Sequence, residues 1–423
     1  MVVGAGPAGI AAAVSAARSG ARSALVDDNP SPGGQIWRNA EHASETSSSA
    51  AAWFERLRST SVQHLFGARV FGADSGVVSA ESADGVLQIA YRDLILATGA
   101  RERFLPFPGW TLANVLGAGG LQALAKSGLP VLNKRIVIAG TGPLLLAVAA
   151  YLQDHGAHVV AICEQTSRTA LARFAWHAFH APGKIAEAWN LSRSIRSVPL
   201  YTNTWPVAAL GDHGRLRVLR ISHQGKIREI ECDYVGCGFH LVPNVELPRS
   251  LGCELENGFV HVDDFQQTSA PHIYCAGEPT VIGGLELSLL EGEIAGYAAA
   301  GRRDTALPLF GQRARYRRFA RAMAQAFSLR PVLKSLAQPD TWICRCEDVS
   351  LERLHEHDSW RAAKLHTRCG MGPCQGRICG AALEFLQGWD TGAPRAPIFP
   401  VRCASVAALA SAHDLTASKG SAQ

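Results

Sequence analysis

The stretch that decides the fold is the first 28 residues, MVVGAGPAGIAAAVSAARSGARSALVDD. Apolar Val2 and Val3 predict a short strand, the glycines of residues 4–9 predict a tight turn, and the alanines after them predict a helix. A second apolar strand, residues 23–26, ends at Asp27. A strand, a glycine turn, a helix and a second strand in this order predict a βαβ unit.

Each glycine of this turn has a physical task. Gly4 permits the tight turn, Gly6 lets a pyrophosphate approach the backbone, and Gly9 lets the helix pack on the strand. The phosphates would lie at the helix N-terminus, where unpaired amides and the helix dipole favour negative charge. Asp27, at the end of the second strand, is placed to accept a hydrogen bond from an adenosine ribose. The unit therefore predicts a dinucleotide site, against the alternative of a tight turn without a ligand.

Length and composition limit the kind of protein. A chain of 423 residues is too long for one compact core, since domains usually have roughly 100 to 200 residues. With 47% hydrophobic and 18% charged residues, it is an ordinary globular protein. The net charge of +5 is mild and the basic residues are scattered apart from one run, which argues against a nucleic-acid partner. Two or three domains are expected.

The N-terminus carries two further signals. Only three residues precede Gly4, whereas a strand usually has about five or six, so the start looks clipped or misassigned and Met1 is not established as the natural start. The chain shows no basic leader followed by an apolar stretch, and no window of roughly 18 apolar residues. The expected location is cytoplasmic, with at most peripheral contact at the inner face of the membrane.

Residues 135–164 repeat the plan of the first unit, with RIVIA as a strand, a glycine turn, a helix and a second strand. Gly140 and Gly142 let a nucleotide approach the turn, but leucine at position 145 replaces the third glycine and keeps helix and strand further apart. Glu164 would suit a ribose without a 2′-phosphate. Two interpretations stay open: a second nucleotide, of NAD type or an adenine nucleotide, or a fold kept as a scaffold or for subunit contact.

Five of the eleven cysteines crowd into one C-terminal segment. They are Cys344, Cys346, Cys369, Cys374 and Cys379. The segment is too short for a large apolar core, so a metal would supply the missing cross-link. Four thiolates satisfy a two-iron, two-sulfur cluster in which each iron takes two sulfurs, and Cys344 and Cys346 form the first pair. Spacing alone leaves Cys369 open as a ligand, and zinc also takes four thiolates.

Three further segments resemble flavoproteins with two dinucleotide-binding domains, of the pyridine-nucleotide-disulphide-oxidoreductase type. They are ILATGA at residues 95–100, YCAGE at residues 274–278 and PGGQIWR at residues 32–38. By this resemblance the first lies near the pyrophosphate side of a bound FAD, the second meets its ribityl chain or phosphate, and the third covers it. The positions implied, together with the flavoprotein form of the first turn, are Pro7, Ala8, Gly34, Gln35, Thr98, Gly99, Gly277 and Glu278.

A closer resemblance is to the alpha-type chains of heteromeric opine oxidases and of proline and hydroxyproline dehydrogenases, and to the B chain of hydrogen cyanide synthase. It rests on ARERFLPFPGW at residues 100–110, GAGGLQALAKSGL at residues 117–129 and GGLELSLLEGEIAG at residues 283–296. This family implies a partner, a glycine-oxidase-like FAD-dependent beta subunit that oxidises the substrate amine. It also leaves room for a small third ferredoxin-like subunit.

The passage CQGRIC at residues 374–379 resembles the module related to bacterioferritin-associated ferredoxin. That resemblance implies Cys374 and Cys379 as the second pair of cluster ligands, beside Cys344 and Cys346, and leaves Cys369 spare. The glycines between these cysteines fit a loop whose backbone amides turn toward the sulfurs.

The expected fold is α/β, with two Rossmann-like dinucleotide-binding domains, of which the FAD domain is split in sequence, and a small helical [2Fe-2S] domain. The expected parts are the FAD domain at 1–105 and 235–305, the NAD-type domain at 106–234, a helical linker at 306–340, the cluster domain at 341–390 and a loosely held tail at 391–423. Short alternating strands at 216–222 and 227–232 predict an antiparallel layer. The linker carries five arginines between 313 and 321, for which a solvated helix face is expected.

The expected function is that of an electron-transferring FAD and iron-sulfur subunit of a heteromeric amine or amino-acid dehydrogenase or oxidase, acting on CH–NH donors. The remaining cysteines are isolated, so no redox disulfide beside a flavin is expected, and no acid–base pair or nucleophile is assigned as catalytic. Two alternatives stay open: a self-contained NAD(P)H-dependent flavin reductase, and a non-catalytic scaffold subunit with a vestigial nucleotide site. The sequence does not identify the amine, the terminal electron acceptor or the stoichiometry.

Overall fold

The computed structural model describes residues 1–40, 48–74, 76–178, 193–392 and 394–409. The chain divides into two compact units, each assembled from separate stretches of sequence. The first unit contains Met1–Ala100, Pro243–Arg317 and the described residues after Gly392, and the second contains Arg101–Val242 and Arg318–Gly392. The chain crosses between them four times: at β8 (Ala100–Glu102), at β17 (Leu241–Pro243), within α10 (Phe310–Ala326) and after Gly392.

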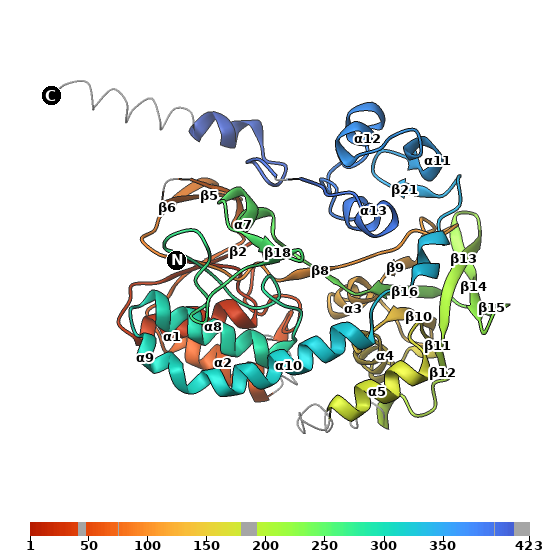
Figure 1. The fold of residues 1–423 in the computed structure, drawn as a ribbon, viewed down its shortest axis with the longest axis horizontal. Helices are drawn as coiled ribbons and strands as arrows, with labels where there is room; N and C mark the ends of the chain where they lie inside the picture. The colour runs from red at the N-terminus through yellow and green to blue at the C-terminus, as the bar shows by residue number, and fades with distance from the viewer. Residues whose placement is uncertain (41–47, 75, 179–192, 393, 410–423) are drawn as a thin grey trace. The chain divides into compact units, whose positions relative to one another are not determined.

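The first unit is built on a parallel five-stranded sheet with the strand order β20-β7-β1-β2-β3, of which Figure 1 labels β2. Its strands are β1 (Val2–Val3), β2 (Ala24–Asp27), β3 (Gln63–Phe66), β7 (Leu94–Leu96) and β20 (Ile273–Cys275). Val2 pairs with Leu25 on one side and with Ile95 on the other, so β1 is central despite its length. Strand β20 follows residues 101–242 of the second unit in sequence but pairs with β7 in this sheet. The prediction that this domain is split in sequence is therefore confirmed.

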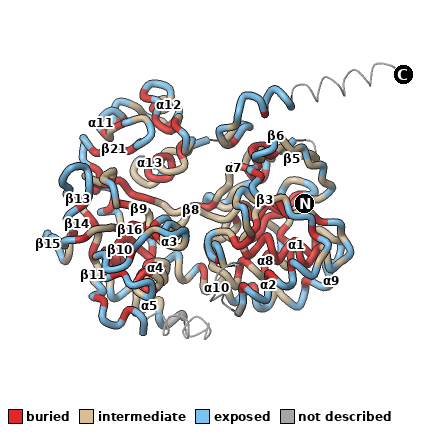
Figure 2. Tube along the Cα trace, turned by 180° about the vertical axis from the view of Figure 1, so that it is seen from behind, coloured by how far each residue is buried: buried red, intermediate tan, exposed pale blue. Residues whose placement is uncertain are grey.

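Helices α1 (Pro7–Arg18) and α8 (Leu285–Ala299) pack on each other beside this sheet. A Cβ on Gly292 would lie 2.1 Å from the Ala8 carbonyl oxygen, and one on Gly296 would lie 2.4 Å from that of Ala12. These glycines therefore permit the two helix backbones to touch. Figure 2 shows the resulting core, in which α1 is buried from Pro7 to Ala16.

The remaining elements of the first unit are short. They are α2 (Ser48–Arg58), α7 (Glu246–Ser250), α9 (Arg303–Ala306), the 3₁₀ turn η2 (Leu307–Leu309), the hairpin of β18 (Leu255–Glu256) with β19 (Phe259–Val260), and the antiparallel layer of β4 (Arg69–Asp74), β5 (Val77–Ser82) and β6 (Gly85–Ala90). The tail packs against this layer. Ile398 is buried and donates its amide to the Phe71 carbonyl, and Arg402 pairs with Glu81 at 3.0 Å. The expected loose tail is thus wrong for this stretch, because it finds an edge carbonyl and a carboxylate to bind.

The second unit repeats the design with a parallel sheet ordered β12-β11-β10-β16-β9. Its parallel strands and helices are β9 (Val115–Gly117), α3 (Ala118–Lys126), β10 (Arg135–Thr141), α4 (Leu144–Asp154), β11 (His158–Glu164), α5 (Arg168–Ala178), β12 (Leu200–Thr202) and β16 (Tyr234–Phe239). The predicted antiparallel layer is confirmed as β13 (Thr204–Asp212), β14 (Arg215–His223) and β15 (Lys226–Glu231). The chain therefore contains two Rossmann-like folds, as predicted.

The cysteine-rich segment belongs to the second unit and has a small core of its own. Its elements are the 3₁₀ turn η3 (Pro331–Ser335), the hairpin of β21 (Trp342–Cys344) and β22 (Val349–Ser350), and the helices α11 (Leu351–Leu354), α12 (Trp360–Thr367) and α13 (Cys379–Gln387). Ile343, Leu354, Trp360 and Leu383 fill this core beside three of the cysteines. No helix in the described part of the chain is both long and apolar enough to span a bilayer.

The arginine-rich helix α10 differs from its expected solvated form on one face. Arg315, Arg318 and Arg321 are exposed, as expected. Arg313 is 4% exposed and pairs with Asp264 at 2.8 Å, and Arg317 pairs with buried Glu291 at 2.8 Å. The two arginines lie one helical turn apart, so they share the face that packs within the first unit.

Candidate functional site

The first glycine turn leaves no room for side chains at two of its three glycines. Gly4 has a φ of +102°, and a Cβ there would lie 2.2 Å from the Ala97 carbonyl oxygen. A Cβ on Gly9 would lie 1.7 Å from the Gly4 carbonyl oxygen. At Gly6, by contrast, the nearest neighbour of a Cβ would be the Gly34 Cα at 4.0 Å. The chain itself therefore does not require glycine at position 6, whereas a ligand that approaches the backbone there would.

The loop that follows β2 lies against this turn. Gly33 donates its amide to the Ala5 carbonyl at 2.7 Å, and a Cβ on Gly34 would lie 2.8 Å from the Gly6 Cα. Gln35 is exposed, and its side-chain oxygen accepts a hydrogen bond from Arg38 at 3.1 Å. The loop thus lies beside the glycine turn, in the place that a cofactor-covering loop would occupy.

Asp27 ends β2 at the edge of the turn. Its carboxylate accepts the Ala5 amide at 2.5 Å, and both the backbone amide and the side-chain amide of Asn29 at 2.7 Å. Burial raises the pKa of this carboxyl group, and these hydrogen bonds act in the opposite direction. Asp27 therefore holds the turn in place, and its ribose contact stays a prediction.

Thr98 and Gly99 follow β7 where the chain leaves the first unit. The Thr98 hydroxyl donates to the Asn244 carbonyl at 2.6 Å, and the Asn244 side chain donates to the Thr98 carbonyl at 2.8 Å. Gly99 has a φ of +67°, and no described atom beyond its chain neighbours lies within 4 Å of the position of a Cβ. Because Gly4 packs on Ala97, this segment lies directly behind the first glycine turn.

Gly277 and Glu278 complete the group from β20. Gly277 has a φ of +81°, and a Cβ on it would lie 2.9 Å from the Cβ of Ala8, so the two FAD-type segments touch. One carboxylate oxygen of Glu278 accepts the Gly284 amide at 3.0 Å, while the other is buried with no hydrogen-bond partner in the described chain. Burial, followed by the charge of Glu291, raises the pKa of Glu278 to about 7.

An unpartnered buried carboxylate oxygen is costly unless a donor reaches it. The hydroxyls of a ribityl chain are such donors, so the residues around Glu278 fit FAD. The sequence-predicted positions from residues 4–9, 27, 34, 98–99 and 277–278 thus come together at the carboxyl ends of the parallel strands β1, β2, β7 and β20. This edge of an open α/β sheet is where ligands of such folds bind.

The second glycine turn is held by its own acid. Glu164 is buried, and its carboxylate accepts the Thr141 hydroxyl at 2.8 Å, the Gly142 amide at 2.7 Å and the Thr166 amide at 2.8 Å. Burial raises the pKa of this group. Gly140 is required by packing, because a Cβ there would lie 1.8 Å from the Gly238 carbonyl oxygen.

The segment after α10, residues 327–330, lies along the carboxyl edge of this second sheet and is called the edge cover below. The Phe327 carbonyl is within hydrogen-bond reach of the Thr141 hydroxyl at 3.5 Å and of the His240 ring, and the Ser328 carbonyl accepts the Gln165 side chain at 3.1 Å. The contacts come from the ends of β10, β11 and β16. Burial lowers the pKa of His240, and the hydrogen bond to the Phe327 carbonyl acts in the opposite direction.

Arg330 fastens the end of the edge cover. Its guanidinium donates to the side-chain oxygen of Asn203, next to β12, and lies over the Trp205 ring at 5.0 Å. The chain therefore occupies the edge at which a second nucleotide would bind. No local pattern in residues 327–330 predicted this, since the contacts reach four separate strands.

The five clustered thiols lie together, in a grouping that differs in one respect from the predicted pairs. Cys344, Cys369 and Cys379 are buried with their sulfurs within 4.8 Å of one another. The Cys346 sulfur lies 3.8 Å from that of Cys374, near the surface. The sulfurs thus form a buried group of three and an outer pair, Cys346 with Cys374, because the turn after β21 exposes Cys346 while Cys344 stays in the core; the predicted ligand pairs stay a prediction.

The buried thiols interact strongly. The Cys369 and Cys379 thiols donate to the Cys344 sulfur, which lowers the pKa of Cys344 and raises theirs. Cys374 interacts electrostatically with Cys369, and Cys344 with Cys346. A set of sulfur donors this dense fits an iron-sulfur cluster or zinc.

Glycines shape the loop around these thiols. The Gly370 amide points to the Cys344 sulfur at 3.5 Å, as predicted, and a Cβ on Gly372 would lie 2.3 Å from that of Cys346. Gly370 and Gly376 also leave space for the Trp360 ring, since a Cβ on either would lie within 3.0 Å of it. The loop thus needs glycine both for the sulfurs and for its tryptophan.

The passage at residues 100–110 has a structural role that motif reasoning missed. Glu102 accepts the Gly119 and Gly120 amides at 2.6 and 3.0 Å and so caps α3, where the helix dipole favours its charge. Arg103 pairs with Glu384 at 3.4 Å, and the Trp110 indole donates to the Trp342 carbonyl at 2.6 Å. This passage joins the cysteine-rich segment to the second nucleotide fold.

Comparison with known proteins agrees with this geometry. The pyridine nucleotide-disulphide oxidoreductase family matches residues 1–302. The HcnB component of hydrogen cyanide synthase from Pseudomonas aeruginosa is 31% identical over 95% of this chain and 96% of its own length. The A component of opine oxidase from Rhizobium meliloti is 31% identical, and the match covers 91% of each protein. Both similarities run through the cysteine-rich segment as well as the nucleotide folds.

Solved structures with the same fold are more distant in sequence. L-proline dehydrogenase from P. horikoshii superposes with a TM-score of 0.65 at 19% identity, covering 96% of this chain and 78% of that one. Thioredoxin reductase from T. acidophilum gives 0.55 at 20% identity, covering 71% and 96%. At such identities these likenesses establish the fold.

Proposed function

The chain belongs to the pyridine nucleotide-disulphide oxidoreductase family of FAD-dependent enzymes, and from this premise we propose that it is the electron-transferring FAD and iron-sulfur subunit of a heteromeric dehydrogenase or oxidase. Its substrate class would be an amine or amino acid with a CH–NH bond, such as an opine, proline, hydroxyproline or glycine. A glycine-oxidase-like FAD-dependent beta subunit would oxidise that substrate, in the cytoplasm. The relatives from hydrogen cyanide synthase and opine oxidase are each named as one subunit of a larger enzyme, which supports the heteromeric assignment.

The observation that carries the proposal is the cluster of thiols in a chain that also has an FAD-type site. A bound flavin takes up two electrons and can release them one at a time, and an iron-sulfur centre carries them singly. In this proposal Cys344, Cys346, Cys374 and Cys379 hold a [2Fe-2S] cluster, and Cys369 stays a free thiol beside them. Cys346 and Cys374 form the side of the site nearest the surface.

The position of the edge cover argues against the alternative of a self-contained NAD(P)H-dependent reductase. A pyridine nucleotide would need the edge at which Phe327, Ser328 and Arg330 make their hydrogen bonds. In this proposal the second nucleotide fold carries the cysteine-rich segment and takes no NADH. The scaffold alternative is disfavoured by Glu278, whose buried unpartnered oxygen would be a standing cost in a chain that never binds a ligand.

The experiment that tests the function is co-expression with an adjacent reading frame that encodes a glycine-oxidase-like flavoprotein. Oxidation of glycine, proline, hydroxyproline and opines is then measured with an artificial electron acceptor. We expect turnover only when both chains are present, and FAD and iron in the purified complex. Equal turnover without this chain would overturn the proposal, and bleaching of the flavin of the isolated chain by NADH alone would favour the reductase alternative.

Metal analysis of cysteine variants tests which thiols bind the metal and whether that metal is iron or zinc. Cys344→Ala should lose bound iron, whereas Cys369→Ala and Cys403→Ala, an exposed cysteine outside the cluster, should retain it. Zinc in place of iron in the wild-type chain would contradict the electron-transfer role. Iron loss in Cys369→Ala would make Cys369 a ligand.

A further inference from the structure

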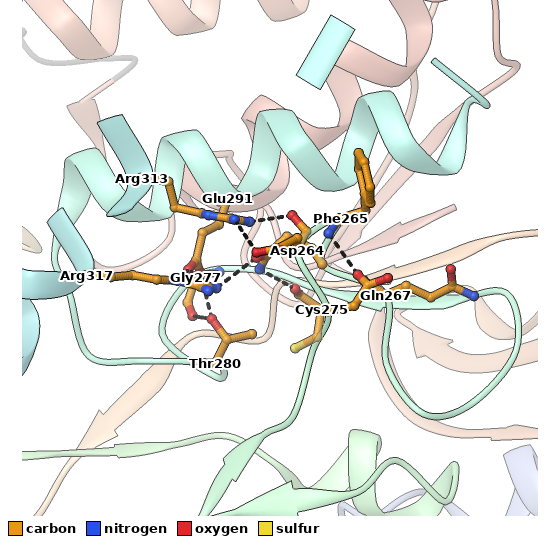
Figure 3. A network of polar contacts seen from close by, with 11 residues as sticks. Asp264, Phe265, Gln267, Cys275, Gly277, Thr280, Glu291, Arg313 and Arg317 are labelled. Atoms are coloured by element: carbon orange, nitrogen blue, oxygen red, sulfur yellow. Dashed lines mark hydrogen bonds and ion pairs between the residues drawn. The ribbon is translucent and has the colours of Figure 1, made fainter. Parts of the chain in front are cut away.

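An ion pair between the fully buried Glu291 and the partly exposed Arg317 lies behind the Gly277 turn and joins helix α8 to helix α10 (Figure 3). We propose that Glu291 and Arg317 are positioning residues for FAD: they touch no ligand themselves, and they hold the segment of Gly277 and Glu278 in its binding conformation. This inference rests on the proposed function in so far as FAD is the ligand. It also gives helix α10 a task beyond linking the parts of the chain.

Glu291 binds the turn with one carboxylate oxygen. That oxygen accepts the Gly277 amide at 3.1 Å and the Thr280 hydroxyl at 2.7 Å. Gly277 has a left-handed backbone and packs on Ala8, within the first glycine turn. Glu291 therefore fixes the residue through which the two FAD-type segments touch, immediately before the unpartnered carboxylate of Glu278.

Arg317 binds the other carboxylate oxygen of Glu291 with two nitrogens, at 2.9 and 2.8 Å. It also donates to the Gln266 side-chain oxygen at 2.9 Å, and the Gln266 side chain donates to the Cys275 carbonyl at 2.9 Å. Cys275 is the last residue of β20. One guanidinium thus holds the strand end and the turn after it.

The side chain of Glu291 is fully buried, on a helix whose other buried residues are apolar except Ser288. A charge in such a place is tolerated only with a partner of opposite sign and with its hydrogen bonds filled. Arg317 supplies the charge, and Gly277 and Thr280 supply the remaining donors. If Arg317 is removed, the buried Glu291 carboxylate loses its partner of opposite charge and the hydrogen bonds from that partner, so its hold on the Gly277 turn weakens.

Arg313, on the same helix α10, serves as the control for Arg317. Arg313 lies one turn before Arg317, on the same face, and pairs with Asp264 at 2.8 Å. It anchors α10 as Arg317 does, but its hydrogen bonds go to Asp264 and not to Glu291 (Figure 3). A role in packing alone would make the two arginines equivalent, whereas a positioning role separates them.

The test compares Arg317→Gln, Glu291→Gln and Arg313→Gln in the full chain. The readouts are the dissociation constant for FAD, the reduction potential and visible spectrum of the bound flavin, and the melting temperature without FAD. We expect Arg317→Gln and Glu291→Gln to weaken FAD binding by about tenfold and Arg313→Gln by less than about twofold, since one to two hydrogen bonds are at stake. The two effective variants should also shift the flavin potential.

Thr280→Val is the milder variant if Arg317→Gln fails to fold. It removes one donor to Glu291 and should weaken FAD binding by about threefold. Equal FAD affinity in Arg313→Gln and Arg317→Gln at matched melting temperatures would overturn the inference. A wild-type chain that binds no FAD at all would instead overturn the proposed function.

Discussion

The chain runs through the same kind of turn twice, at residues 4–9 and 140–145, and the two turns differ in their surroundings. Their acids behave alike: Asp27 and Glu164 each accept three hydrogen bonds from the chain at the end of the second strand. At the first turn, Glu278 keeps a buried oxygen without a partner in the described chain. At the second, the edge cover contacts the ends of four strands.

The different surroundings of the two turns indicate that a glycine turn alone does not decide whether a nucleotide binds. The turn provides backbone amides and close approach, which both copies have. Binding also needs the edge of the sheet to be open to the ligand, and this depends on segments that are remote in sequence. Four substitutions test whether the two turns differ in this way.

The largest effect is expected for Gly6→Ala at the first turn. The added methyl fits the chain, because its nearest neighbour would be 4.0 Å away, but it takes the place of an approaching pyrophosphate. FAD affinity should fall about a thousandfold, or about 4 kcal/mol, while the unfolding free energy without FAD changes by about 1 kcal/mol or less. Fluorescence titration with FAD measures the first and urea unfolding the second. Unchanged FAD affinity would remove the first turn from the site.

The next effect concerns Glu278 and pH. Its pKa of about 7 in the folded chain exceeds its ordinary value of 4.5, chiefly because burial disfavours the charge. The folded chain therefore holds this proton more tightly, so the stabilising contribution is complete below pH 4.5 and is lost as pH rises through about 7. Between these limits the FAD-free chain should lose about 3 kcal/mol of unfolding free energy from this group.

Glu278→Gln tests that assignment. The variant should lack this part of the pH dependence, and urea unfolding across the same pH range measures it. Asp27, Glu102 and Glu164, whose pKa values burial also raises, titrate in both proteins and cancel in the difference. Parallel pH curves for the two proteins would show that the Glu278 carboxyl group is solvated.

A smaller effect is expected when the edge cover is loosened at the second turn. Arg330→Ala removes the hydrogen bond to Asn203 and the contact with the Trp205 ring, and should lower the unfolding free energy by about 2 kcal/mol. Millimolar NADH should then raise the melting temperature of the variant but not of the wild type. Exposed Arg321→Ala is the matched control. Equal stabilisation of the wild type by NADH would show that the edge is open.

The smallest effect is expected for Gly142→Ala, the counterpart of Gly6→Ala. Among the described residues, no atom beyond the adjoining residues lies within 4 Å of the added Cβ, but the φ of +99° is unfavourable for alanine. The unfolding free energy should fall by about 1 to 2 kcal/mol, and FAD affinity should stay the same. A loss of FAD affinity here as large as that of Gly6→Ala would erase the distinction between the turns.

Much of the fold was predictable because its signals are local. Apolar strands, glycine turns and alanine-rich helices at 2–27 and 135–164 are periodic patterns within one stretch of chain, and both βαβ units form as expected. The crowding of five cysteines within residues 344–379 likewise brings their sulfurs together. The pairing of Cys346 with Cys374 was not predictable, because it depends on which side of a turn faces the core.

The candidate site was only partly predictable. Its contact positions follow from motifs, but Glu291 and Arg317 carry no motif and lie on different helices. The sequence does not single out Glu291 either, because α8 also contains Glu286 and Glu293, and only the structure shows which of these acids is fully buried and requires a partner. The sequence does not say which of the five arginines in α10 is that partner, since helical spacing puts several of them on neighbouring faces.

By itself, the sequence determined two nucleotide folds, the positions of their glycine turns and acids, and a cluster of thiols. These follow from backbone sterics and hydrophobic periodicity, which act over a few residues. Only the tertiary structure decided that Glu278 keeps a buried oxygen without a partner in the described chain, and that residues 327–330 lie along the edge of the second sheet. Both outcomes depend on which donors and carbonyls, remote in sequence, lie within hydrogen-bond distance of a buried polar atom. Only the packing of the whole chain determines this.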